Sequence, residues 1–304
     1  MSDAMCAVTI GNFDGVHVGH AALVRRAREL AGPGGRVVAM SFDPHPISRL
    51  RPAETPARLT TFERRAELLL SAGADEVVKL EPTDDLLGLE PDAFIRGVVE
   101  KYSANWFVEG EDFHFGKRGR GTPRTLKVLG EAFGFGVEIV PAVEVELSDQ
   151  LLARASSSLV RWLLKCGRVR DIARVLGRPY ELSGIVHQGD QRGRTIGFPT
   201  ANLVSGCMSP VDGVYSAVAV LPDGRELAAA VNVGSRPTFN GVDRRIEAHV
   251  IGEKLGLEYS WPLTLRFVGF VRDQLKFDGV ARLVEQLGRD CVRAKDAVEE
   301  NLVA

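Results

Sequence analysis

Two histidines lie in a glycine-rich turn near the start of the chain, in the segment GNFDGVHVGH at residues 11–20. Glycine lets a backbone approach a ligand closely, and the N–H groups at a helix N-terminus bind phosphate. His17 and His20 are three residues apart, so on the first turn of a helix they share a face and can stabilise charge on one anion. The turn predicts a nucleotide site, with phosphate contacts expected from Gly11, Phe13, Gly15 and Gly19.

A second glycine-rich segment, HQGDQRGRTIGFPTANL, occupies residues 187–203. It lacks the GK[ST] ending of a Walker loop and therefore predicts a different way of binding phosphate. Thr200 and Asn202 are two residues apart, so they project to one face of an extended segment, and both offer oxygen ligands suited to Mg²⁺. The pair favours a metal held against nucleotide phosphates, although a Thr-x-Asn pair by itself is more typical of a turn.

The elements expected around the histidine turn alternate between strand and helix. Short apolar runs predict five strands, at residues 6–11, 35–42, 75–80, 105–110 and 136–140. Apolar residues at three- and four-residue spacing predict helices at residues 20–31, 61–73 and 91–102. Such alternation is typical of βαβ units, so the first half is expected to be an α/β domain with a parallel sheet.

The pattern changes near VLGRPYELSG, residues 175–184. Strand-like runs then follow one another through Gly, Pro and Asp turns without intervening helices, at residues 183–187, 213–220, 226–234, 245–251 and 263–271. They predict an antiparallel sheet or small barrel, closed by an amphipathic helix at residues 279–302. We therefore expect two domains, 1–176 and 177–304.

Composition and charge narrow the functional classes. The chain has 304 residues with 45% hydrophobic and 26% charged residues, which is typical of folded globular proteins with more than one core. A net charge of −2 gives no field for nucleic acid. No apolar run reaches the roughly 20 residues that cross a bilayer, so we expect no membrane partner and a cytoplasmic location. The four cysteines lack CxxC spacing, which argues against a zinc ribbon or a disulfide framework.

The motifs resemble, in order and spacing, those of the prokaryotic bifunctional riboflavin kinase/FAD synthetase family. GNFDGVHVGH looks like the HxGH motif of the nucleotidyltransferase superfamily, and SFDPHP, EGEDFHFG and ASSSLVRWLLKCG follow it as they do in the family. The segment GRTIGFPTANL resembles the flavokinase signature. The resemblance spans nearly the whole chain and implies a Rossmann-like nucleotidyltransferase domain followed by a flavokinase-like β-barrel.

For the first half, the resemblance implies FMN adenylylation, in which FMN attacks ATP, pyrophosphate leaves and FAD forms. His17 and His20 are then expected to stabilise the α- and β-phosphates. Ser157, Ser158 and Arg161, at another helix N-terminus, are expected to hold the pyrophosphate, although serines there are often simple caps. Asp112 and Phe113 are assigned to the flavin pocket, and Phe113 could equally be a core aromatic residue.

For the second half, the resemblance implies phosphorylation of riboflavin by ATP with Mg²⁺. It assigns ATP phosphates to Gly189, Arg192, Gly193 and Arg194, and metal coordination to Thr200 and Asn202. Glu247 is the candidate for the carboxylate that takes the proton of the substrate hydroxyl, and it could otherwise be a solvent-facing strand residue. Arg272 is placed near the flavin, and could otherwise be a surface charge.

The chain departs from the family pattern at three places. Gly121-Thr122 stands where the family more often has Gly-Asp, Leu159 replaces a commonly basic residue, and the loop GEKLGLEYSWP after Glu247 is altered. Two alternatives to a bifunctional enzyme therefore stay open: a riboflavin kinase with weakened adenylylation, and a non-catalytic flavin or nucleotide sensor. The sequence indicates no oligomeric state.

Overall fold

The chain forms two compact units in the computed structural model, which describes residues 5–189, 192–238, 241–253 and 259–303. The first unit contains residues 1–145 and 152–157, and the second contains residues 146–151 and 158–304. Among the described residues, no helix combines the length and the apolar character needed to cross a membrane. Each unit contains its own core and its own cavity.

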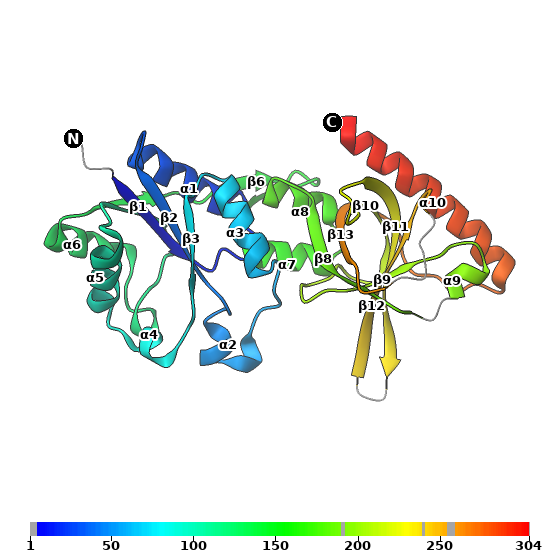
Figure 1. Ribbon diagram of the computed structural model, residues 1–304, viewed down its shortest axis with the longest axis horizontal. Coiled ribbons are helices and arrows are strands. Elements are labelled where there is room, and N and C mark those ends of the chain that lie inside the picture. The colour runs from blue at the N-terminus through cyan, green and yellow to red at the C-terminus, as the bar shows by residue number, and fades with distance from the viewer. Residues whose placement is uncertain (1–4, 190–191, 239–240, 254–258, 304) are drawn as a thin grey trace. The chain divides into compact units, whose positions relative to one another are not determined.

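The first unit is built on a five-stranded parallel sheet with the order β3-β2-β1-β4-β5 (Figure 1). Its strands are β1 (Cys6–Gly11), β2 (Arg36–Phe42), β3 (Glu76–Leu80), β4 (Trp106–Gly110) and β5 (Gly136–Val140). Strands β1, β2 and β3 follow one another toward one edge of the sheet, and β4 and β5 follow one another toward the other edge. The strand order therefore changes direction between β1 and β4. In open α/β sheets ligands bind at such a point, beyond the carboxyl ends of the strands.

Helices cover both faces of this sheet. One face packs β1, β2 and β4 against α1 (Val18–Ala31) and α3 (Phe62–Ser71) through small and branched apolar side chains. The other face packs against α5 (Pro91–Tyr102) and α6 (Pro123–Phe133) through Phe94, Ile95, Phe107 and Leu126. The sheet is apolar on both sides, as parallel sheets covered by helices usually are.

Shorter elements complete the first half of the chain. They are α2 (Ile47–Leu50), η1 (Pro52–Glu54), α4 (Asp84–Gly88), η2 (Lys117–Gly119), and the two-stranded sheet of β6 (Glu144–Glu146) and β7 (Leu152–Arg154). Helices α7 (Ser157–Lys165) and α8 (Val169–Leu176) follow. From Ser158 onward these helices belong to the second unit, where α8 buries Val169, Ile172 and Val175.

The second unit is a closed antiparallel barrel with the order β10-β11-β12-β9-β8-β13. Its strands are β8 (Tyr180–His187), β9 (Ala201–Val204), β10 (Gly213–Val220), β11 (Glu226–Thr238), β12 (Gly241–Val250) and β13 (Pro262–Arg272). A short helix, α9 (Arg192–Thr195), precedes β9, and the long helix α10 (Val280–Val303) packs against β10, β11 and β13. Tyr180, Tyr215 and Phe267 fill the interior.

The predicted fold class is confirmed, with a parallel α/β unit followed by an antiparallel barrel and a terminal helix. Strand β9 and the helix α9 were not expected, because the segment around them is rich in Gly and Pro and has no clear apolar alternation. The expected domain boundary between residues 176 and 177 stays a prediction. By packing, α7 and α8 group with the barrel.

Candidate active sites

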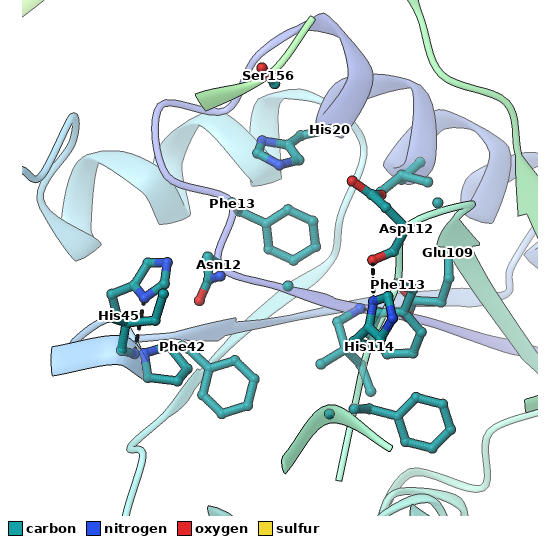
Figure 2. A pocket seen from close by; sticks show the side chains of 18 of the residues that line it. Asn12, Phe13, His20, Phe42, His45, Glu109, Asp112, Phe113, His114 and Ser156 are labelled. Atoms are coloured by element: carbon teal, nitrogen blue, oxygen red, sulfur yellow. Dashed lines mark hydrogen bonds between the residues drawn. The ribbon is translucent and has the colours of Figure 1, made fainter. Parts of the chain in front are cut away.

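The first unit contains a cavity of about 990 Å³ at the carboxyl ends of β1, β2 and β4. Figure 2 shows Phe13 from the turn after β1, His20 from the first turn of α1, His45 from the segment after β2, and Asp112 and Phe113 from the segment after β4. The predicted site residues that line this cavity are Gly11, Phe13, His17, Gly19, His20, Asp112 and Phe113. The cavity lies where the change in strand order predicts a ligand site.

His17 and His20 lie against each other at the start of α1. Their rings stack with centroids 3.6 Å apart and an interplanar angle of 25°, and the edge of Phe13 contacts His20 at 5.1 Å. A Cβ on Gly19 would lie 3.0 Å from the His17 ring, so glycine is needed for this arrangement. His17 is the N-cap residue of α1, which places both imidazoles at the positive end of the helix dipole.

The turn that carries the histidines has an unusual backbone held by a buried carboxylate. Phe13, Gly15 and Val16 have φ values of 47°, 85° and 41°, a region that costs energy for residues other than glycine. Asp14 is buried and accepts hydrogen bonds from the backbone N–H groups of Leu59 and Thr60 at 3.0 to 3.1 Å. These bonds fix the turn to the segment before α3 and so offset its strain.

Asp112 and Phe113 occupy the wall formed by the segment after β4. The Asp112 carboxylate is largely exposed and forms an ion pair with Arg154 at 3.1 Å. Phe113 is half-buried and stacks on Phe115 with ring centroids 5.1 Å apart. One face of Phe113 therefore supports the core while the residue also lines the cavity, so the two predicted roles of this side chain are compatible.

The sequence interpretation missed several residues that line this cavity, namely Asn12, His45, Glu109, Arg154 and Ser156. Asn12 and Ser156 each lie next to a residue that was predicted. Glu109 is the notable case, because it is a carboxyl group on a central strand that is only 1% exposed. A charged residue in the apolar run NWFVEG is a signal that could have identified it.

The predicted pyrophosphate residues lie at the start of α7. The Ser157 hydroxyl donates a 2.6 Å hydrogen bond to the backbone carbonyl of Asp14, which ties the α7 N-terminus to the histidine turn. Ser158 and Arg161 follow on α7 and belong to the second unit. The phosphate roles of these three residues stay predictions.

The second unit contains a cavity of about 870 Å³ on the outer wall of the barrel, between strands β9, β11 and β12, helix α10 and the segment at residues 273–279. The predicted residues that line it are Gly193, Thr200, Asn202, Glu247 and Arg272. Gly189 and Arg194 are close in sequence to residues that line it. The side chain of Arg192 lies outside the described residues, and so do residues 190–191. In the altered loop after Glu247, residues 254–258 also lie outside them.

Glu247 stands in a row of polar side chains across three strands. It is directly opposite Asn202 on β9 and Asn232 on β11, so all three project to the same face. The Asn232 amide donates to a Glu247 carboxylate oxygen at 3.4 Å, and the Gln274 amide donates to the Asn232 Oδ1 at 2.9 Å. The Gln274 contact orients the Asn232 amide so that its N–H faces Glu247.

The surroundings of Thr200 and Asn202 fit a metal ion that is shared with nucleotide phosphates. Both side chains line the cavity, while the alternate residues Ala201 and Leu203 are buried in the barrel. A Cβ on Gly189 would lie 2.2 Å from the Asn202 amide, so the glycine loop passes directly over it. Within the described residues no three His, Cys, Asp or Glu groups lie together as a metal cluster.

Arg272 is held by the protein on several sides. Its guanidinium forms a paired contact with the buried carboxylate of Asp290 at 2.7 to 3.1 Å and donates to the Asp273 carbonyl at 2.8 Å. Gln286 donates to the same carboxylate at 2.9 Å. This network fixes α10 to the end of β13, so Arg272 has a structural role. Its predicted contact with the flavin stays a prediction.

Both halves of the chain match known families. The family model for FAD synthetase matches residues 1–151, and the family model for riboflavin kinase matches residues 176–298. A bifunctional riboflavin kinase/FMN adenylyltransferase of Escherichia coli (strain K12) is 32% identical over 295 residues, covering 96% of this chain and 92% of that protein. The protein of the same name from Bacillus subtilis (strain 168) is 32% identical over 297 residues, covering 94% and 90%.

The fold is shared with a solved structure over nearly its whole length. A crystal structure titled as a macrolide-efflux protein from Streptococcus pneumoniae is 30% identical, with a TM-score of 0.85. The similarity covers 95% of this chain and 93% of that chain. The same order of an α/β unit and a barrel is therefore found in an experimental structure.

Proposed function

The chain belongs to the bifunctional riboflavin kinase/FMN adenylyltransferase family, and we propose how its residues divide the two reactions. The enzyme phosphorylates riboflavin with ATP to FMN, and it adenylylates FMN with a second ATP to FAD and pyrophosphate. We assign the second reaction to the cavity of the first unit and the first reaction to the barrel. The observation that carries this assignment is that each cavity lies within one unit and is lined by residues of one motif set, His17 and His20 in the first and Thr200, Asn202 and Glu247 in the second.

In the first cavity the histidine pair acts on the phosphates of ATP. The phosphate of FMN attacks the α-phosphorus, so negative charge builds up on the transferred group and on the leaving pyrophosphate. The stacked rings of His17 and His20 at a helix N-terminus supply hydrogen-bond donors and positive potential there. Ser157, Ser158 and Arg161 hold the pyrophosphate, and Asp112 and Phe113 border the flavin.

In the barrel Glu247 takes the proton from the ribityl hydroxyl of riboflavin as the γ-phosphoryl group of ATP arrives. The Asn232 amide holds the carboxylate in place, which supports this role. The glycine loop with Gly189, Gly193 and Arg194 surrounds the ATP phosphates, together with Arg192. Thr200 and Asn202 hold Mg²⁺, which neutralises charge between the β- and γ-phosphates when bound.

The alternative that adenylylation is weakened was suggested by Thr122, which stands where the family more often has an aspartate. The Thr122 hydroxyl accepts a hydrogen bond from the Thr125 N–H at 3.3 Å and caps α6. Threonine and aspartate are both good N-caps, so the substitution retains this structural function. We therefore propose that both activities are retained, and that the enzyme works in the cytoplasm because both reactions consume ATP.

The direct test is to supply the two substrates separately. Riboflavin with ATP and Mg²⁺ should give FMN and then FAD, and FMN with ATP and Mg²⁺ should give FAD and pyrophosphate. A chelator in excess over Mg²⁺ should stop FMN formation. Formation of FMN without any FAD would leave a monofunctional kinase, and binding of both flavins without turnover would leave a sensor.

A further inference from the structure

Glu109 lies where the two central strands of the first unit part. Strands β1 and β4 pair at Ala7 with Trp106 and at Val8 with Phe107. Beyond that point the Ile10 N–H on β1 donates to the side-chain carboxyl of Glu109 on β4 at 2.8 Å. The side chain thus fills the gap between the strands at the point where the cavity begins.

The surroundings of Glu109 favour its uncharged form. The residue is 1% exposed, and within the described residues no cation forms an ion pair with it. Burial raises the pKa of the carboxyl group well above its ordinary value, and the hydrogen bond from Ile10 opposes this only in part. One oxygen accepts the Ile10 N–H, so the O–H of the other oxygen is available to a neighbour.

We propose that Glu109 is a specificity residue that donates a hydrogen bond from its neutral carboxyl group to an acceptor atom of a substrate ring. The cavity wall around it contains the aromatic side chains of Phe13, Phe42 and Phe113, which suit a flat heterocycle. Flavin and adenine both carry such acceptors. The inference rests on the assignment of FMN adenylylation to this cavity.

Other titratable groups reach the cavity from each element around Glu109. They are His17 and His20 from the start of α1, His45 and Arg51 after β2, Asp84 on α4, Asp112, His114, Lys117 and Arg118 after β4, and Arg154 on β7. None of them is a cause of the raised pKa of Glu109. A pH effect that belongs to Glu109 must therefore be separated from theirs by a variant that cannot titrate at this position.

Two substitutions separate hydrogen bonding from packing. Glu109→Gln keeps an acceptor for the Ile10 N–H and an N–H donor for the ligand, whereas Glu109→Met keeps the volume and removes both. We expect Glu109→Met to raise the KM for FMN or for ATP about 3- to 10-fold, the usual consequence of losing one hydrogen bond. Glu109→Gln should stay within about 2-fold of the parent, well below that loss.

The rise in KM identifies the ring, because it should appear for one of the two substrates. A rise for FMN places the acceptor on the flavin, and a rise for ATP places it on adenine. Equal KM values in the parent and Glu109→Met, at an unchanged unfolding midpoint, would overturn the proposal. So would a loss of kcat in Glu109→Met with no change in either KM, because that pattern belongs to a structural residue.

The pH profile gives a second and independent readout. As the pH rises through the raised pKa, the parent loses its donor, so its KM should increase, whereas Glu109→Gln should lack this component. The folded state of the parent holds this proton more tightly than the unfolded chain does, so its stabilising effect is present at low pH and lost as the pH rises. As the pH rises, the unfolding midpoint of the parent should therefore fall relative to that of Glu109→Gln.

Controls distinguish failure of this inference from failure of the site assignment. Glu76→Gln changes an exposed glutamate on strand β3 of the same sheet, and it should alter neither KM. His20→Ala should abolish most FAD formation if the cavity performs adenylylation. Full FAD formation by His20→Ala would reject the site assignment itself, whereas loss in His20→Ala with no effect of Glu109→Met would reject only the role of Glu109.

Discussion

The two cavities of the chain differ in how they treat carboxyl groups. In the first unit Glu109 is buried and favoured as a neutral acid, and the Asp112 carboxylate is engaged by Arg154. In the barrel Glu247 is half-buried and its carboxylate receives an amide N–H. Under the proposed assignment, the first cavity therefore offers imidazoles and a neutral donor to its ligand, whereas the second offers Glu247 as a base.

The difference follows the nucleophile of each reaction. The phosphate of FMN is already ionised at neutral pH, so its attack on ATP needs alignment and charge stabilisation but no base. The hydroxyl of riboflavin carries a proton that must leave, so its phosphorylation needs a group to accept it. Variants that remove one of these features from one site test the comparison directly.

The largest effect is expected from Glu247→Gln, which keeps the shape of the side chain and removes the base. FMN formation from riboflavin should fall about 100- to 10,000-fold, the range that a general base contributes. FAD formation from supplied FMN should stay at the parental rate. Both rates are measured by separating flavins after timed incubations with ATP and Mg²⁺.

Glu226→Gln is a matched control, because Glu226 is an exposed glutamate at the start of β11 that pairs with Arg266. It should leave both activities unchanged. A folded Glu247→Gln enzyme that phosphorylates riboflavin at the parental rate would show that the base lies elsewhere in the barrel.

A somewhat smaller loss is expected from His20→Ala, which acts on the first cavity alone. Removing one group that stabilises transition-state charge commonly costs about 100- to 1,000-fold in rate. FAD formation should fall by that amount in kcat, while riboflavin phosphorylation continues. A change confined to the KM for ATP, with kcat intact, would mean that His20 only binds the nucleotide.

The third prediction concerns where the kinase unit begins. A chain of residues 158–304 retains α7 from Ser158 onward and all of α8, whereas a chain of residues 177–304 lacks both helices and their buried apolar side chains. Both should phosphorylate riboflavin, and the shorter chain should be less stable by about 2 kcal/mol, since its lost burial is partly offset by the entropy of the eight helical residues lost from each of α7 and α8. Denaturant unfolding of the two chains measures this difference.

Equal stability of the two chains would mean that neither α7 nor α8 adds to the stability of the barrel and that the boundary at residues 176/177 also holds structurally. A shorter chain that folds yet makes no FMN would instead show that α7 or α8 contributes to kinase chemistry.

The five strands of the parallel sheet and helices α1, α3 and α5 could be predicted because each strand is a short apolar run and each helix is amphipathic, whereas α6 was not expected. His17, His20 and Glu247 could be identified because their motifs are local in sequence. By contrast, Asn232 and Gln274 reach Glu247 only through the pairing of β11 with β12 and the return of the chain after β13. The position of Glu109 between β1 and β4 could not be predicted, because it depends on where these two strands stop pairing and not on any single segment of the sequence.

The smallest effect is expected at Gln274, which touches the base only through Asn232. Its amide donates to the Asn232 Oδ1 at 2.9 Å and to the Val233 carbonyl at 3.1 Å, and this leaves the Asn232 N–H directed at Glu247. Gln274→Met removes both bonds and frees the Asn232 amide to turn. Loss of one such neutral hydrogen bond is worth about 0.5–1.5 kcal/mol, so kcat for FMN formation should fall about 2- to 10-fold.

If Gln274 acts by orienting the base, the loss should appear in kcat for FMN formation, with the KM for riboflavin and the rate of FAD formation unchanged. The double variant Gln274→Met with Asn232→Ala distinguishes this relay from a direct effect, since removing Asn232 leaves Gln274 nothing to orient. Gln274→Met should then cost little further activity. If the two losses multiply in full, Gln274 acts on the reaction independently of Asn232, and the positioning of Glu247 by this chain of amides is refuted.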